Sequence, residues 1–113
     1  MEVVELRGVK PTHVNKYMKA AGRARCVRLA GAEAQRIAEL WRDLPAGHQM
    51  RCHIPPFGLR FIAEGQVICE GSICWKCNNI FGDVGGEPFA YEFDAKADVS
   101  QALLLQLRRV MNG

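Results

Sequence analysis

A Cys-x-x-Cys motif, Cys74-Trp75-Lys76-Cys77, is the feature of this sequence best suited to chemistry. One chemistry with this spacing is a structural zinc site, which needs four ligands and therefore two further donors. Cys52, His53 and Cys69 are the candidates for those donors. The other chemistry is a thiol–disulfide centre, whose reactive cysteine is exposed and has a lowered pKa, typically at the start of a helix.

The residues around the motif favour packing over both chemistries. From Val67 to Cys77 the odd-numbered positions are mostly apolar and the even-numbered ones mostly polar, which is typical of a half-buried strand. In one continuous strand Cys74 and Cys77 point to opposite faces, with Cys74 on the polar one. A turn at Trp75-Lys76 is not expected, because neither residue favours turns. Free cysteine packs as a small apolar side chain, so we predict structural cysteines without a metal or cofactor. A zinc site made of Cys52, His53, Cys74 and Cys77 and a redox centre at Cys74 and Cys77 remain the alternatives.

Polar residues on the same predicted sheet face form a candidate binding surface. Its members are Arg51, His53, Arg60 and Cys74. A histidine between basic residues, with Glu70 near it, could act as a general acid or base. No nucleophile is placed to work with it, and the chain has no phosphate-binding loop. We expect no catalytic residues and favour a protein that is not an enzyme.

The composition is that of one ordinary domain. The chain has 113 residues, of which 49% are apolar and 24% charged, so a single domain over residues 1–113 can bury a core without covalent links. No apolar run approaches the ~20 residues of a membrane span, and the N-terminus lacks the charge and apolar stretch of a signal peptide. We therefore expect a cytoplasmic protein without membrane contact. An odd number of cysteines in that compartment predicts free thiols rather than disulfides.

Charge is distributed unevenly along the chain. Residues 6–32 contain no acid and seven basic side chains, whereas residues 83–98 are mainly acidic. A basic stretch could contact nucleic acid or an acidic protein. Solvated surface is the simpler interpretation, because Tyr17 is the only aromatic residue available there to stack on bases.

Periodicity predicts elements in the first half of the chain. Val3 to Leu6 and Cys26 to Ala30 are short strand candidates. Residues 12–21 fit one face of an amphipathic helix, although the pattern is ambiguous. Gly31 to Leu44 is a firmer helix, which Pro45 ends.

The second half predicts a sheet and a final helix. Alternation predicts strands at residues 50–54 and 57–62, a Gly-containing hairpin turn at 63–66 and a strand at 89–93. A helix follows, capped by Asp98 or Ser100. The pattern indicates an α+β fold, with an antiparallel sheet of four to five strands and helices packed on one face.

Two stretches carry a resemblance to known sequences. CHIPPFGLRF, from Cys52 to Phe61, and ICWKCNNIF, from Ile73 to Phe81, resemble a group of small, mostly bacterial, uncharacterised proteins. The similarity spans roughly residues 28–110. It implies a shared fold and brings no established activity. Small bacterial proteins of this build are often accessory or immunity-type proteins that bind another protein, which is an analogy.

These observations favour a non-enzymatic protein-binding module. A more specific form of this hypothesis is an immunity-type inhibitor of a bacterial toxin, since opposed charge patches can steer a protein partner. The first alternative is the small zinc or thiol-redox protein centred on Cys74 and Cys77. The second is nucleic-acid binding through the basic N-terminal third.

Overall fold

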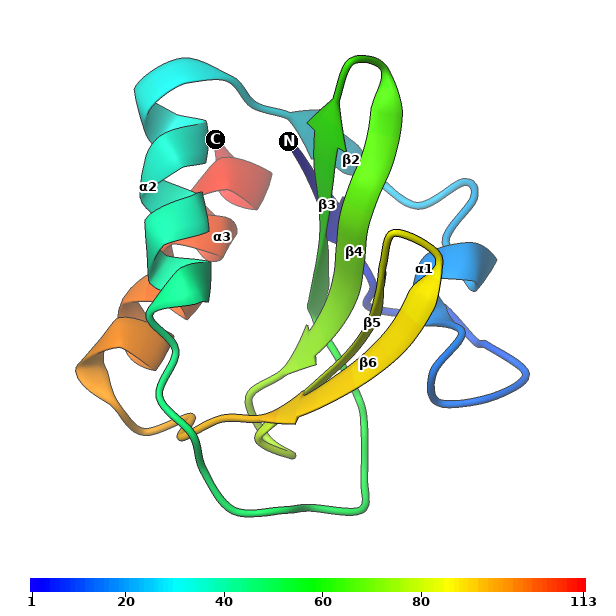
Figure 1. Ribbon diagram of the computed structural model, residues 1–113, viewed down its shortest axis with the longest axis vertical. Helices are drawn as coiled ribbons and strands as arrows, with labels where there is room; N and C mark the ends of the chain where they lie inside the picture. The colour runs from blue at the N-terminus through cyan, green and yellow to red at the C-terminus, as the bar shows by residue number, and fades with distance from the viewer.

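A six-stranded antiparallel sheet forms the centre of the computed structural model, which describes residues 1–113 (Figure 1). The strands lie in the order β2-β1-β3-β4-β5-β6. Their bounds are β1 Glu2–Glu5, β2 Cys26–Arg28, β3 Phe57–Ala63, β4 Gln66–Cys74, β5 Asn79–Val84 and β6 Glu87–Glu92. The α+β class and the antiparallel sheet are confirmed, with six strands where four to five were expected.

Two long helices cover one face of the sheet. They are α2 (Gly31–Arg42) and α3 (Asp98–Asn112), and Figure 1 shows both on the same side. The main core lies between them and the sheet. Its fully buried side chains include Ile37, Phe57, Leu59, Ile73, Phe93, Leu103 and Leu107. None of the helices combines the length and apolar character that crossing a membrane requires.

A short helix lies on the opposite face. This helix, α1 (Tyr17–Ala20), is much shorter than the amphipathic pattern over residues 12–21 suggested. Met18 and Ala21 pack there with Val4 and Leu6 in a small second cluster. Val14, an apolar residue within that pattern, is half exposed. The helix therefore begins only at Tyr17, and residues 12–16 form a loop.

The β3–β4 hairpin follows the sequence prediction. Glu64 and Gly65 connect the strands, and their φ angles are positive, at 53° and 77° respectively. This conformation characterises the two-residue turns whose twist matches antiparallel strands. The two strands pair along their whole length, with one irregularity between Phe61 and Ile62.

Strand β5 was not predicted, because its sequence resembles a loop. Gly82 and Asp83 lie in its middle and are poor strand formers. A Cβ atom at residue 82 would collide with the Glu70 carbonyl oxygen of β4. The absence of a side chain at Gly82 therefore allows β5 to lie this close to β4. The sheet requires glycine at this position, although glycine made the segment resemble a loop in the sequence.

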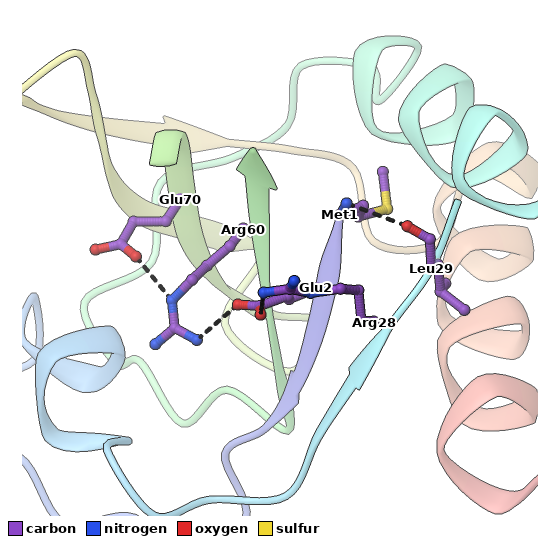
Figure 2. Close-up of polar contacts among 6 residues, drawn as sticks. All are labelled: Met1, Glu2, Arg28, Leu29, Arg60 and Glu70. Carbon is purple, nitrogen blue, oxygen red and sulfur yellow. Dashed lines mark hydrogen bonds and ion pairs between the residues drawn. The ribbon is translucent and has the colours of Figure 1, made fainter. Parts of the chain in front are cut away.

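A charged row ties four strands together on the α1 side of the sheet (Figure 2). Glu2 of β1 accepts from Arg28 of β2 at 2.8 Å and from Arg60 of β3 at 3.4 Å, and Arg60 also donates to Glu70 of β4 at 3.1 Å. Hydrogen bonding to Arg28, with the charge of Arg60 adding to it, lowers the pKa of Glu2 despite partial burial. Arg60 further donates to the Met18 carbonyl at 3.3 Å, which links the row to α1.

Candidate thiol centre

A turn follows β4 at the point where a continuous strand was expected. Strand β4 ends at Cys74, residues 75–78 form a turn, and β5 begins at Asn79. Asn78 has a φ of 58°, the left-handed conformation that asparagine tolerates better than most residues. The prediction that Cys74 and Cys77 point to opposite faces of one strand is therefore wrong. The Cys77 N–H donates to the Cys74 sulfur at 3.2 Å.

Packing against α3 explains why Trp75 occupies a turn. Its Nε1–H donates to the Ser100 carbonyl at 2.8 Å, and its ring meets Phe93 edge to face. The indole is buried as a result. Local turn propensity is overridden here by tertiary contacts, and Asn78 was the one local signal of the turn.

A long loop brings a third cysteine to this turn. Residues 43–56 connect α2 to β3 without the strand predicted at residues 50–54, and Figure 1 shows the loop passing below the sheet, at the end where β4 turns into β5. Cys52 of this loop forms a disulfide with Cys77, with 5.5 Å between their Cα atoms. The expectation of free thiols throughout is wrong. It rested on compartment and cysteine parity, and neither reports which sulfurs the fold brings together.

Cys74 completes a cluster of three sulfur-bearing residues. Its side chain shares a sheet face with Ser72, as the alternation predicted, but it is fully buried because the loop covers it. Two backbone N–H groups donate to its sulfur, that of Cys77 and that of Ile54 at 3.4 Å. A free thiol is thus held between the loop and the turn, directly beside a disulfide.

A neutral polar network fixes the loop in place. His53 Nδ1 lies 2.6 Å from Asn79 Oδ1, and His53 Nε2 lies 2.7 Å from Ser72 Oγ. The Asn79 amide nitrogen donates to the Cys52 carbonyl at 2.7 Å and to the Met50 carbonyl at 3.4 Å. Because the Asn79 nitrogen is used there, its oxygen faces the histidine, and Nδ1 carries the imidazole proton. Asn79 therefore holds both the histidine and the backbone of Cys52.

Burial determines the chemistry of this network. A serine, histidine and asparagine at these distances have the spacing of a hydrolase triad. Ser72, His53 and Asn79 are only 1%, 3% and 2% exposed, so a substrate cannot reach the hydroxyl. Burial lowers the pKa of His53, and its hydrogen bond to Asn79 opposes this only in part. The network therefore positions the cysteine loop.

Comparisons with known proteins return no match. No family model fits the chain, and neither a curated protein nor a solved structure matches it significantly. The resemblance of the two motif stretches to a bacterial group stays a prediction.

The residues proposed as a binding surface lie at different depths. Arg51 is exposed in the loop, His53 and Cys74 are buried, and Arg60 is half-buried in the charged row. The expectation of a histidine on the surface is wrong, and Ser72 and Asn79, which engage it, were missed. No local pattern in the sequence singled out either residue.

The contacts of His53 and the disulfide argue against the zinc site of Cys52, His53, Cys74 and Cys77 in the oxidised protein. Both ring nitrogens of His53 are hydrogen-bonded to Ser72 and Asn79, which removes it from the proposed ligand set. With Cys52 and Cys77 joined, no group of three or more His, Cys, Asp and Glu side chains is arranged to hold a metal ion.

Cys26 and Cys69 lie outside the cluster. Cys26 is in the edge strand β2, and Cys69 is half-buried in β4. Burial raises the pKa of both thiols, and nearby carboxylates, such as that of Glu2 for Cys26, raise it further. Because the thiolate is the reactive form, these two cysteines are poorly activated.

An apolar groove adjoins the cluster. Its volume is about 470 Å³, and Ile54, Trp75 and Lys76 line it next to the cysteines. Arg7 and Arg108 also line the groove, and no acid does. A larger hollow of about 970 Å³ lies between residues 11–19 and strands β5 and β6, and no cysteine lines it. No cysteine lines the groove itself, but Lys76 directly precedes Cys77 and Ile54 lies two residues after Cys52, so the groove borders the thiol centre.

Proposed function

We propose that the protein is a thiol–disulfide exchange module that acts on another protein. Cys52–Cys77 is the reactive disulfide and Cys74 is an internal thiol. The observation that supports this most is the Cys74 sulfur, which accepts a hydrogen bond from the backbone of Cys77 and so lies beside the disulfide. Exchange needs a thiolate, a disulfide sulfur and access, and Cys52 supplies access because it is an exposed residue.

The reaction runs in two substitutions. A thiolate of the partner attacks the Cys52 sulfur, a mixed disulfide forms, and Cys77 leaves as a thiolate that then takes up a proton. A second partner thiolate then attacks the partner sulfur of that mixed disulfide and Cys52 leaves. The partner dithiol is oxidised to a disulfide, and the Cys52–Cys77 disulfide is reduced by the same two electrons.

Cys74 gives the module a second internal route. Its thiolate can attack the Cys77 sulfur, which forms a Cys74–Cys77 disulfide and releases Cys52 as a thiolate. This step consumes no oxidant, since one disulfide replaces another. The two N–H groups that donate to the Cys74 sulfur hold it in position, and during the attack the negative charge moves from this sulfur to that of Cys52. Cys52 then becomes a free thiol on an exposed loop.

The groove indicates the chemistry of the partner. Ile54 is 62% exposed and lies two residues after Cys52, so an apolar side chain of a partner could bury it. Arg7, Lys76 and Arg108 surround the groove without a neighbouring acid. A protein segment with apolar and acidic side chains beside a cysteine fits this surface. The immunity-type inhibitor stays a prediction within this protein-binding hypothesis.

The test is exchange with a defined peptide. The oxidised protein is incubated with a reduced peptide that carries two cysteines flanked by leucine and glutamate. A metal chelator is present throughout. We expect peptide disulfide to accumulate while Cys52 and Cys77 become free. Cys77→Ser combined with Cys74→Ser has no disulfide to exchange and should leave the peptide reduced, whereas Cys26→Ser combined with Cys69→Ser should react like the wild type. A disulfide that persists in excess peptide would exclude the proposal.

A second candidate is binding of nucleic acid. Arg7, Lys10, Arg23 and Arg25 gather around one hollow, with Glu5 as the only acid among its lining residues. A cluster of cations attracts phosphates and releases counterions. Binding of a labelled single strand should weaken steeply as salt is raised. No binding at low salt, or binding independent of salt, would contradict this candidate.

A further inference from the structure

We infer that the reduced protein binds a soft metal ion of the zinc class through the thiolates of Cys52, Cys74 and Cys77, with the fourth coordination position open. The inference rests on the convergence of these three residues. It goes beyond exchange with a partner and does not require it.

The spacing of the three cysteines suits a metal. Cys74 and Cys77 are the Cys-x-x-Cys pair that zinc sites use, and the turn places the Cys74 sulfur 3.2 Å from the Cys77 nitrogen. Zinc–sulfur bonds of about 2.3 Å set tetrahedral thiolates about 3.8 Å apart. A disulfide holds its sulfurs about 2 Å apart, so a metal needs the Cys52 and Cys77 sulfurs to separate by roughly 2 Å. Rotation of the Cys52 side chain on its exposed loop can supply that movement.

The surroundings support thiolate charge. The N–H groups of Ile54 and Cys77 donate to the Cys74 sulfur, as outer hydrogen bonds do for metal-bound ligands. Three thiolates on one divalent ion carry a net negative charge. Arg51 and Lys76 each directly precede a ligand cysteine and are exposed. Residues 48–56 and 71–82 contain no acid, so no carboxylate from these segments opposes that charge.

The fourth coordination position of the metal stays open because His53 is not free to fill it. His53 follows Cys52, but Ser72 and Asn79 occupy its two ring nitrogens, and the network that holds the loop would have to break for it to bind. Three protein ligands with an open position characterise exchangeable or catalytic zinc rather than closed structural zinc. A water molecule or a thiolate from a partner can complete the tetrahedron.

The disulfide and the metal exclude each other. When Cys52 and Cys77 are joined, no ligand group for a metal remains. An external disulfide such as oxidised glutathione can take the two electrons of the Cys52 and Cys77 thiolates. The protein disulfide then forms, two molecules of glutathione thiol are produced after protonation, and the metal is released. The site therefore responds to the thiol–disulfide balance around it.

Cobalt titration of the reduced protein tests the inference. Protein that has been reduced and desalted without oxygen should bind one Co²⁺ per chain, with tetrahedral ligand-field bands and thiolate charge-transfer absorption, and Zn²⁺ should displace the Co²⁺. Cys52→Ser, in the exposed loop, should weaken Co²⁺ binding at least tenfold, and Cys74→Ser and Cys77→Ser should do the same if circular dichroism shows that they fold.

Matched controls keep the result specific. Cys26→Ser and Cys69→Ser each remove one thiol from elsewhere in the sheet and should leave Co²⁺ affinity unchanged. Oxidised glutathione should release the metal from wild-type protein. Absence of thiolate charge transfer in the reduced wild type, or equal loss in a control variant, would overturn the inference. The peptide exchange assay contains a chelator, so either result leaves the exchange proposal to its own test.

Discussion

Two polar networks lie side by side on the α1 face of the sheet and use alternate residues of β4. The charged row runs through Glu70, and the neutral network runs through Ser72. In the first, the side chains of Glu2, Arg60 and Glu70 keep 16–24% of their surface exposed. In the second, every member is nearly fully buried. Solvent screens the charged row, whereas the neutral network has no water to replace a lost partner.

This difference separates scaffold from site. The charged row connects residues that strand pairing already places opposite each other, so it adds to a register that the sheet sets. The neutral network holds a loop that has no strand of its own and brings Cys52 to Cys77. The buried polar groups therefore do more to fix the position of the cysteine loop than the charged row does to fix the strands.

Removing the disulfide should have the largest effect on stability. Closing a loop with a sequence separation of 25 residues stabilises a chain by about 3.5 kcal/mol in the chain-entropy estimate. Cys52→Ser should lower the free energy of unfolding in urea by an amount of this order, relative to oxidised wild type. A reductant should abolish the difference between the two proteins. An equal difference in the presence of reductant would mean that the serine acts by another route.

Breaking the neutral network should come next. Asn79→Ala removes the partners of the His53 Nδ1–H and the Cys52 carbonyl, and unsatisfied buried groups cost about 1–3 kcal/mol each. We expect a loss of about 2–3 kcal/mol and a disulfide that reduces faster. Asn78→Gly is the matched control, because glycine accepts the positive φ at that neighbouring position. A disulfide as slow to reduce as in the wild type would show that the loop does not depend on Asn79.

The two networks should respond to acid in different pH ranges. The folded protein lowers the pKa of His53 from 6.5. As the pH falls, this histidine is therefore protonated in the unfolded chain before it is protonated in the folded one. Its contribution is complete above pH 6.5 and falls as the pH drops toward the lowered value, by at most about 1.4 kcal/mol per pH unit. Glu2 has a pKa lowered from 4.5, and its contribution is complete above pH 4.5 and is lost as the pH falls further.

Urea unfolding across pH separates these ranges. His53→Gln should flatten the stability profile between pH 6.5 and 5, and Glu2→Gln should leave that range unchanged. Added salt should reduce only the Glu2 contribution. A flat wild-type profile above pH 5 would contradict the assignment of His53 as a buried neutral histidine.

The charged row should show the smallest effect. Arg60→Met keeps the aliphatic contact and removes the bonds to Glu2 and Glu70. We expect a loss of about 0.5–1 kcal/mol at low salt and less at high salt, since solvent screens partly exposed pairs. Arg28→Met, at a largely exposed position, should change the unfolding midpoint less than Arg60→Met does. A larger loss for Arg60→Met than for Asn79→Ala would reverse the ranking of the two networks.

Local signals explain which parts of the fold the sequence predicts. Helices α2 and α3 and the β3–β4 turn were found because their signals lie within a few neighbouring residues. Strand β5 was missed because Gly82 serves a contact with β4 that the local pattern does not contain. The same limit applies to Trp75, whose place in a turn is set by Ser100 of α3.

The arrangement of the candidate site depends on contacts between residues that are far apart in the sequence. The sequence singled out Cys52, His53, Cys74 and Cys77, and three of these four converge. Their arrangement could not be predicted, because it requires a loop and a turn that are 25 residues apart to meet. The partners of His53, Ser72 and Asn79, are fixed by the same meeting and by no local pattern.

Disulfide mapping shows directly whether Cys52 is joined to Cys77. Oxidised protein is alkylated under denaturing, acid-quenched conditions, digested, and analysed by mass spectrometry. We expect a peptide pair linked through Cys52 and Cys77, with Cys26, Cys69 and Cys74 alkylated. A disulfide that includes Cys26 or Cys69, or five alkylated cysteines after exposure to oxidised glutathione, would contradict this pairing.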